Sequence, residues 1–98
     1  MMTGKQKRHL RTMAHSLKPV VNLGKFGLSR ETKKEIDTQL LEHELIKLKF
    51  LDSCTISKKE CADLLKQENS LEVVQIIGKT LTLYSPHPEE PKIELPSV

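Results

Sequence analysis

The apolar residues of this chain alternate between helical and strand spacing, and this alternation limits the possible fold more than any other feature of the sequence. Segments with an apolar residue at every third or fourth position are separated by short segments rich in strand-forming residues. In order, they predict helix, strand, helix, strand, helix, strand, strand. This order favours an α/β domain in which three helices cover a compact four-stranded mixed sheet. The 98 residues leave room for one such domain, which we expect over residues 1–84.

The first predicted helix spans residues 4–17. Thr3 and Gln6 have the spacing of a capping box, which marks the start of a helix. Apolar residues then recur with a helical period: Leu10, Met13, Ala14 and Leu17. The opposite side of this helix is polar and mostly basic: Lys5, Arg8, Arg11, Thr12 and His15, with Lys7 and Lys18 beside the apolar stripe. We therefore expect one face of the helix on the core and a basic face in solvent.

A short strand, a glycine loop and a second helix are predicted next. Pro19 ends the first helix, and residues 20–23 have the composition of a strand. The sequence Gly-Lys-Phe-Gly at residues 24–27 then interrupts the regular structure. Ser29 is a favourable N-cap for a helix that continues to about residue 43.

The next predicted elements are a strand and a third helix. Over residues 46–50 apolar residues alternate with Lys47 and Lys49, which indicates a strand with one covered face. A second capping box, formed by Ser57 and Glu60, precedes a helix over about residues 58–68. The helical spacing places Cys61 in the core.

A hairpin and a tail complete the chain. Both faces of the segment 73–77 carry apolar residues, namely Val73, Val74, Ile76 and Ile77, which predicts an interior strand. Gly78-Lys79 then turns the chain into residues 80–84. Residues 85–98 interleave four prolines with three glutamates, and such a composition predicts disorder. Two roles are open for this tail: it solubilises the chain, or its acids compete with a polyanion for the basic face.

The composition excludes several classes of protein. Two cysteines are too few for a disulfide framework and lack the spacing of a zinc site, so we expect free thiols in a reducing, cytoplasmic compartment. No apolar run is long enough to span a membrane or serve as a leader, which predicts a soluble, unprocessed chain. His9, His15, His43 and His87 are scattered and form no catalytic or metal-binding motif. We expect no catalysis, metal or other cofactor, and no small-molecule substrate.

Charge is distributed unevenly along the chain. Residues 1–34 contain nine Lys and Arg but only one acid, Glu31. Clustered basic side chains release condensed counterions when they neutralise phosphates, so a polyanion is the natural partner. The alternative interpretation is an ordinary solvated surface.

The Gly24–Gly27 loop is the second candidate for contact with a nucleic acid. Glycines allow a backbone to approach a phosphate closely, and the start of the next helix would add its amides to the charges of Lys25 and Arg30. Single-stranded RNA modules of the KH type use such a loop to hold the RNA backbone. The alternative for the loop is a tight turn without function. Phe26 either stacks on a base or folds onto the core.

Four separated motifs in this sequence resemble one known family. They are LKPVV at residues 17–21, LGKFGL at 23–28, HELIK at 43–47 and VQIIGKTLTLY at 74–84. In this order they resemble the YhbY-type RNA-binding proteins of ribosome maturation, whose domain also occurs in plant organelle splicing factors. The resemblance covers about residues 3–84. Phe26 stands where members of the family commonly have glycine, and the tail lies outside the family pattern.

The resemblance implies a fold similar to the carboxy-terminal domain of bacterial initiation factor three. It also implies a non-catalytic function: binding to the rRNA of large-subunit precursors. The residues expected to contact RNA are Lys5, Lys7, Arg8, Arg11, Lys18, Gly24, Lys25, Phe26, Gly27 and Arg30. We expect a monomer. The competing hypothesis is a protein-interaction adaptor that does not touch RNA, because Leu41 lies off the apolar stripe of its helix and a partner helix would use such a residue.

Overall fold

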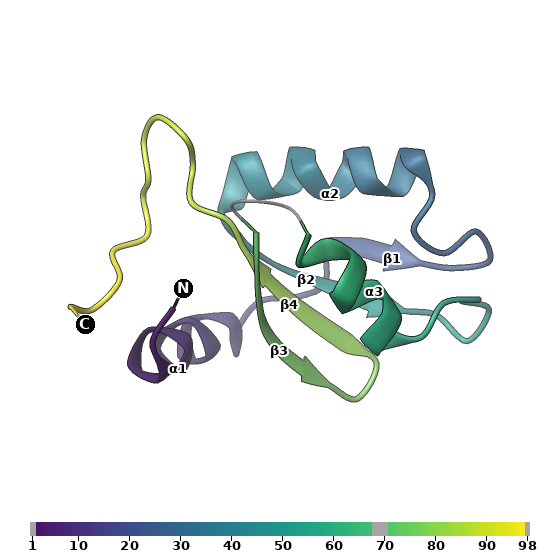
Figure 1. Cartoon of the computed structure of the whole chain (residues 1–98), viewed down its shortest axis with the longest axis horizontal. Helices are drawn as coiled ribbons and strands as arrows, with labels where there is room; N and C mark the ends of the chain where they lie inside the picture. The colour runs from purple at the N-terminus through teal and green to yellow at the C-terminus, as the bar shows by residue number, and fades with distance from the viewer. Residues whose placement is uncertain (1, 68–70, 98) are drawn as a thin grey trace.

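The computed structural model describes residues 2–67 and 71–97, and it confirms the predicted fold class. The elements follow the order α1 (Gly4–Ala14), β1 (Val21–Leu23), α2 (Arg30–His43), β2 (Leu45–Phe50), α3 (Lys58–Leu65), β3 (Glu72–Ile77) and β4 (Thr80–Tyr84). The strands form one mixed sheet in the order β1-β2-β4-β3, in which β1 is parallel to β2 and the other pairs are antiparallel. Helices lie on both sides of this sheet (Figure 1).

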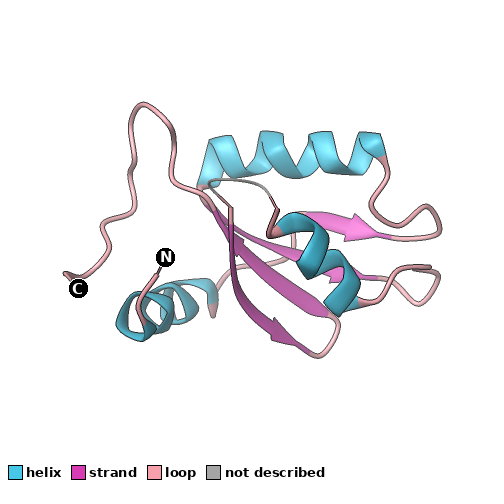
Figure 2. Ribbon diagram, viewed as in Figure 1, coloured by secondary structure: helices cyan, strands magenta, loops and turns pink. Residues whose placement is uncertain are grey.

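Two apolar clusters lie on the two faces of the sheet. The larger one joins α2 and α3 to the strands and includes Ile36, Leu48 and Cys61, all fully buried. Cys61 is therefore a core residue as predicted, and burial raises the pKa of its thiol to about 11. The helix α1 lies on the other face (Figure 2). The smaller cluster joins it to the sheet there: Leu10, Ala14, Leu45, Val74 and Tyr84. Only part of that second face is covered.

The helix α1 begins as predicted and ends earlier. The Thr3 hydroxyl accepts a hydrogen bond from the Gln6 amide, and the Gln6 side chain accepts one from the Thr3 amide, which completes the capping box. The predicted range reached residue 17, but the helix stops at Ala14, and the Leu17 amide donates to the Ala14 carbonyl in a tight turn. The chain must leave the helix there because Pro19 disfavours helical geometry at the preceding residue and Val20 already pairs with Lys47 of β2.

The prediction of an interior strand at residues 73–77 is wrong. The strand β3 lies at the edge of the sheet, and Ile76 and Ile77 are 41% and 61% exposed. Val73 joins the larger cluster and Val74 the smaller one, because successive side chains of a strand point to opposite faces. The β-bulge between Val73 and Gln75 then places Gln75 opposite Thr82, on the same face as Val74. The first half of β3 is therefore apolar on both faces because helices cover it from both sides of the sheet. The interior strands of the sheet are β2 and β4.

The other boundaries differ little from the predicted ones. The strand β1 begins at Val21, one residue after the predicted start, and α3 ends at Leu65. Residue 68, where the third helix was predicted to end, lies outside the described residues. Gly78 has a φ of +55° in the turn between β3 and β4, so the hairpin prediction is confirmed. No helix in the described part of the chain has the length and apolar character needed to cross a bilayer.

Candidate nucleic-acid interface

The Gly24–Gly27 loop is a tight turn with one obligatory glycine. The Gly27 amide donates to the Gly24 carbonyl over 2.9 Å, and Gly27 has a φ of +58°. A Cβ on Gly27 would lie 3.2 Å from Cγ2 of Ile56, so a side chain is disfavoured there both by conformation and by contact. A Cβ on Gly24 would meet only ordinary contacts, of which Ser53 at 3.4 Å is the nearest. The loop geometry therefore depends on Gly27 more than on Gly24.

The segment that precedes α3 supports this loop from beneath. The Thr55 hydroxyl donates to the Lys25 carbonyl over 3.2 Å, although the two residues are 30 positions apart in the sequence. Ile56 is half-buried between the loop and the larger apolar cluster. This support holds the backbone of the loop in place and leaves its side chains in solvent.

Lys25 and Phe26 project from the loop into solvent. The Phe26 ring is 78% exposed, so the alternative in which it folds onto the core is wrong. The ammonium of Lys25 lies 5.6 Å from the centroid of this ring, a cation–π contact. An exposed aromatic face next to a cation suits a flat, negatively charged ligand such as a nucleotide.

The start of α2 adjoins the loop. The Ser29 hydroxyl caps the helix by accepting from the Thr32 amide over 3.2 Å, as predicted. A surface hollow of about 690 Å³ lies here, and its lining residues are Asn22, Gly24, Lys25, Phe26, Ser29, Glu31 and Thr32. Gly27 and Arg30, which were also predicted to contact RNA, do not line this hollow. Glu31 also lines the hollow, and its negative charge disfavours a bound anion. Lys25 is the lining residue that supplies a positive charge.

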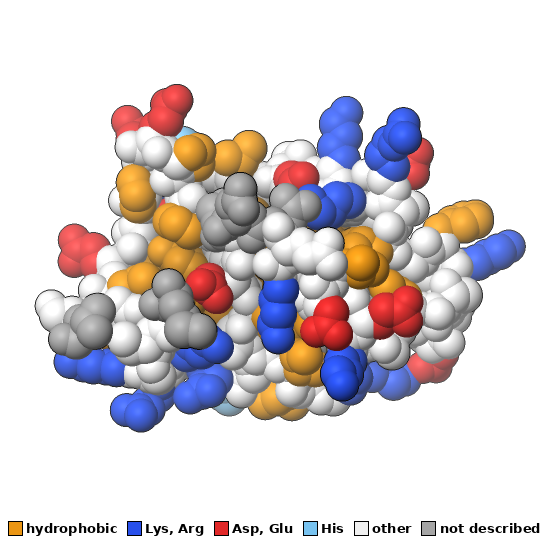
Figure 3. Space-filling model, viewed as in Figure 1, with side chains coloured by type: hydrophobic (Ala, Val, Ile, Leu, Met, Phe, Trp, Pro, Cys, Tyr) orange, Lys and Arg blue, Asp and Glu red, His pale blue; other side chains and the backbone are white. Residues whose placement is uncertain are grey.

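A second surface lies between α1 and the sheet, and we call it the α1 groove. It is a hollow of about 460 Å³ lined by Arg8, Arg11, Thr12, Ala14, His15, Lys47 and Gln75. In the described part of the chain its lining includes no Asp or Glu, so cationic groups from α1 and from β2 face one space without an acid between them. Figure 3 shows Lys and Arg side chains gathered over α1.

The other predicted basic residues of the N-terminal region lie apart from this groove. Lys5 is exposed at the start of α1, and Lys7 is half-buried. Lys18 lines a different hollow, which is mostly apolar and contains Met13, Leu17 and Val20. The structure therefore brings Arg8 and Arg11 together in the groove, whereas Lys5, Lys7 and Lys18 do not line it.

Sequence reasoning missed the part of the site that the sheet supplies. Lys47 pairs with Thr82 of β4, which pairs in turn with Gln75 of β3, so these three residues share one face of the sheet. Lys49 lies on the same face, opposite Asn22 of β1, and Asn22 also lines the hollow at the glycine loop. The exposed face of the sheet therefore connects the α1 groove to the loop. The alternation over residues 46–50 was the available signal for Lys47 and Lys49, whereas no local pattern indicated Gln75.

Comparison with known proteins identifies the family. Residues 2–85 match the CRS1 / YhbY (CRM) domain. The chain is 42% identical over 96 residues to the "Probable RNA-binding protein YqeI" of Bacillus subtilis, covering 98% of this chain and all of the relative. It is 41% identical over 95 residues to a protein of Haemophilus influenzae named "RNA-binding protein", covering 97% and 95% of the two chains.

A solved structure agrees with the fold. The "Solution structure of the hypothetical protein SAV1595 from Staphylococcus aureus, a putative RNA binding protein" superposes with a TM-score of 0.79. It is 42% identical to this chain and matches 98% of this chain and all of its own. These relatives are named as RNA-binding proteins and not as enzymes. The chain belongs to the CRS1 / YhbY (CRM) domain family, in agreement with the motifs of its sequence.

Proposed function

We propose that this protein is a non-catalytic RNA-binding protein that holds the RNA backbone at two places, the α1 groove and the Gly24–Gly27 loop. The names of its relatives support RNA as the ligand. The observation that carries the mechanism is the α1 groove, where Arg8, Arg11 and Lys47 line one hollow without an acidic neighbour among the described lining residues. Such a cluster attracts phosphates at long range and gains free energy when condensed counterions leave.

The exposed face of the sheet extends the proposed site from the groove to the loop. Lys47 and Lys49 are two positions apart on β2, so they are spaced by roughly 6–7 Å along the strand and point to the same side. Asn22 follows on the neighbouring strand and borders the loop. A single RNA strand that crosses this face would meet cations first at α1, then on β2, and then at Lys25.

The loop would contribute close backbone contact and stacking. Gly27 keeps the turn tight, and the exposed ring of Phe26 is free to stack on a base. Phosphate contacts by Lys25 position the RNA without reading its sequence. We therefore expect binding with little sequence preference at the loop. Arg30 would add charge at its edge.

The proposed RNA is the rRNA of large-ribosomal-subunit precursors, on which the protein would act as an assembly factor. This finer assignment is supported by the resemblance of residues 17–28, 43–47 and 74–84 to proteins of ribosome maturation. The proposal includes a cytoplasmic location and a monomeric state.

Two measurements test this function. The first is a sucrose-gradient profile of a cell lysate, probed for this protein at low and at high salt. Co-migration with large-subunit particles at low salt, lost at high salt, is the expected result; migration only as free protein would reject the ribosomal assignment. The second is fluorescence anisotropy with a labelled single-stranded RNA. Affinity that does not change between low and physiological salt would reject the electrostatic mechanism.

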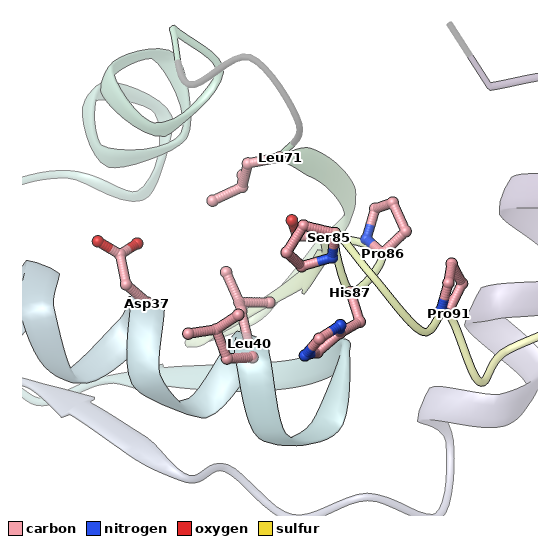
Figure 4. Close-up of a pocket in the computed structure, with 9 residues that line it drawn as sticks. Asp37, Leu40, Leu71, Ser85, Pro86, His87 and Pro91 are labelled. Carbon is pink, nitrogen blue, oxygen red and sulfur yellow. The ribbon is translucent and has the colours of Figure 1, made fainter.

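One observation favours a protein-interaction adaptor as the second candidate. Leu41 is 55% exposed and borders a mostly apolar hollow of about 430 Å³ between α2 and the C-terminal segment, which Asp37, Ser85 and His87 also line (Figure 4). The other side chains that line this hollow include Leu40, Leu71 and several prolines. An adaptor would not bind the labelled RNA at any salt concentration, whereas the proposed RNA-binding site would bind it at low salt and release it as salt rises, so the anisotropy experiment separates the two candidates.

A further inference from the structure

The C-terminal segment, residues 85–97, contacts α1, the helix that binds RNA in the proposed function. Before it reaches α1, the segment is held by Glu44. This residue follows α2 directly, has a φ of +65°, and is 2% exposed. Its amide donates to the Leu40 carbonyl, and its carbonyl accepts from the Ser85 amide over 2.9 Å. A carboxylate buried to this extent is stable only when its oxygens receive hydrogen bonds.

Backbone amides of the C-terminal segment supply these hydrogen bonds. One carboxylate oxygen of Glu44 accepts from the amide of His87 over 2.7 Å. The other oxygen accepts from the amides of Lys92 and Ile93 over 2.8 and 3.0 Å. Burial alone would raise the pKa of Glu44, but these amides and the nearby His87 outweigh it and lower the pKa. The charged carboxylate therefore closes residues 87–93 into a loop over the end of α2.

The chain then runs from this loop onto α1. Ile93 and Leu95 pack against the smaller apolar cluster, which contains Leu10 and Ala14 of α1. The side-chain amide of Gln6 donates to the Pro96 carbonyl over 3.1 Å, and Gln6 is also the capping-box residue of α1. Figure 1 shows the yellow C-terminal segment descending from the end of α2 toward α1.

The helix α1 also packs directly on the sheet, against Leu45 of β2, Val74 of β3 and Tyr84 of β4. Leu10 and Ala14 are its only buried residues among those described. The same helix carries Arg8 and Arg11, which form one wall of the α1 groove opposite Lys47. A shift of α1 would therefore separate these cations and open the groove.

We propose that residues 85–97 form a strap, anchored at Glu44, that holds α1 in the position where Arg8 and Arg11 face Lys47. Glu44 is thus a positioning residue for RNA binding, although it touches no RNA. The proposal rests on the RNA-binding function proposed above. It predicts that loss of the strap weakens RNA binding. If the acids of the tail instead compete with RNA for the basic face, loss of the tail should strengthen RNA binding.

The test compares Glu44→Gln with Glu35→Gln, which removes the same charge from an exposed position on α2. The Gln side chain keeps the size of Glu44 but replaces one acceptor oxygen with a donor, so an amide of the strap loses its partner. Should Glu44→Gln fail to fold, Leu95→Ser is the second variant, because it removes a half-buried side chain that packs on the smaller cluster of which Leu10 and Ala14 are part.

Hydrogen exchange without RNA reads the position of α1 directly. We expect faster exchange of the amides at residues 10–14 in Glu44→Gln and in Leu95→Ser, with the amides of β2 and β4 unchanged. Unchanged exchange in α1 would overturn the strap whether or not the protein binds RNA. This readout therefore separates a failure of the strap from a failure of the proposed function.

RNA affinity supplies the second readout. With a labelled single-stranded RNA, Glu44→Gln should bind roughly 3- to 10-fold more weakly than wild type, and Glu35→Gln should not. The salt slope of log K should fall by about 1.4, corresponding to two lost phosphate contacts. Arg8→Ala should then have no further effect in the Glu44→Gln background, whereas Lys25→Ala should cost as much as in wild type. If Glu44→Gln instead unfolded the whole domain, Lys25→Ala would also have no further effect in that background. Equal or tighter binding by Glu44→Gln, or by a chain that ends at residue 84, would overturn the proposal.

Discussion

Gly27 lies directly against Ile56, so that a Cβ on the glycine would come within 3.2 Å of Cγ2 of the isoleucine. Because the glycine also has a φ of +58°, Gly27→Ala should cost about 1–2 kcal/mol of stability. The melting temperature should fall by about 4–8 °C per kcal/mol. Gly24→Ala is the matched control, since its Cβ would meet only ordinary contacts. Equal melting temperatures for the two variants would contradict the assignment of Gly27 as the obligatory glycine.

Lys25 should contact phosphates without reading bases. We expect Lys25→Ala to weaken binding to all single-stranded RNA sequences by a similar factor of about two to five, and to reduce the salt slope by about 0.7. Lys59→Ala, an exposed position on α3, is the control for the loss of one positive charge and should leave affinity unchanged. Identical affinities for wild type and Lys25→Ala would remove Lys25 from the site.

Phe26 should act on RNA binding and leave folding unaffected. Its ring is 78% exposed, so Phe26→Ala should change the free energy of unfolding by less than about 0.5 kcal/mol. If the ring stacks on a base, the same variant should lose about 1–3 kcal/mol of binding to single-stranded RNA. Duplex RNA, whose bases are already stacked, should bind almost as before. Equal losses on the two forms of RNA would argue against stacking.

Glu44 should make stability depend on pH in the acid range. Its pKa lies below the ordinary value of 4.5, so the charged form stabilises the folded state. This contribution is fully present above the unfolded pKa, and it is lost as the pH falls below 4.5 through the folded pKa. Chemical denaturation between pH 7 and pH 3 should therefore bring wild type and Glu44→Gln together at the acid end. At pH 7 the variant should be about 1–3 kcal/mol less stable. A difference that is constant over this range would show that the charge of Glu44 does not stabilise the fold.

Local interactions explain which parts of the fold were predictable. The capping box of Thr3 and Gln6, the N-cap at Ser29 and the turn at Gly78 each depend on residues within a few positions of one another. The place of β3 in the sheet depends on distant parts of the chain. A periodic pattern shows that Val73 and Val74 are both buried, but it does not distinguish cover by neighbouring strands from cover by helices.

The residues of the candidate site also fall into two groups: those indicated by the local sequence and those brought in by distant parts of the chain. Arg8, Arg11, Lys25 and the glycines were found because they cluster in the first third of the sequence. Gln75 reaches the α1 groove only through the bulge in β3 and its pairing with Thr82, and neither feature has a local signal. The contacts of Glu44 with residues 87–93 were missed for a similar reason, because the partners are main-chain amides. Disorder of residues 85–98 in solution stays a prediction that competes with the strap, and the exchange rates of those three amides decide between the two.

Main-chain donors also determine how the C-terminal segment can change in evolution. Every residue except proline has an amide hydrogen, so Glu44 can be satisfied by almost any sequence of the correct length. In this chain the three donors are at positions 87, 92 and 93, and the prolines at 86, 88 and 91 occupy none of them. Positions 87 and 92 therefore tolerate most side chains other than proline, and the spacing of the donors tolerates no insertion or deletion. Ile93 and Leu95 must in addition stay apolar, because they pack on the smaller cluster. Low sequence similarity in this region among relatives would be compatible with a retained structural role.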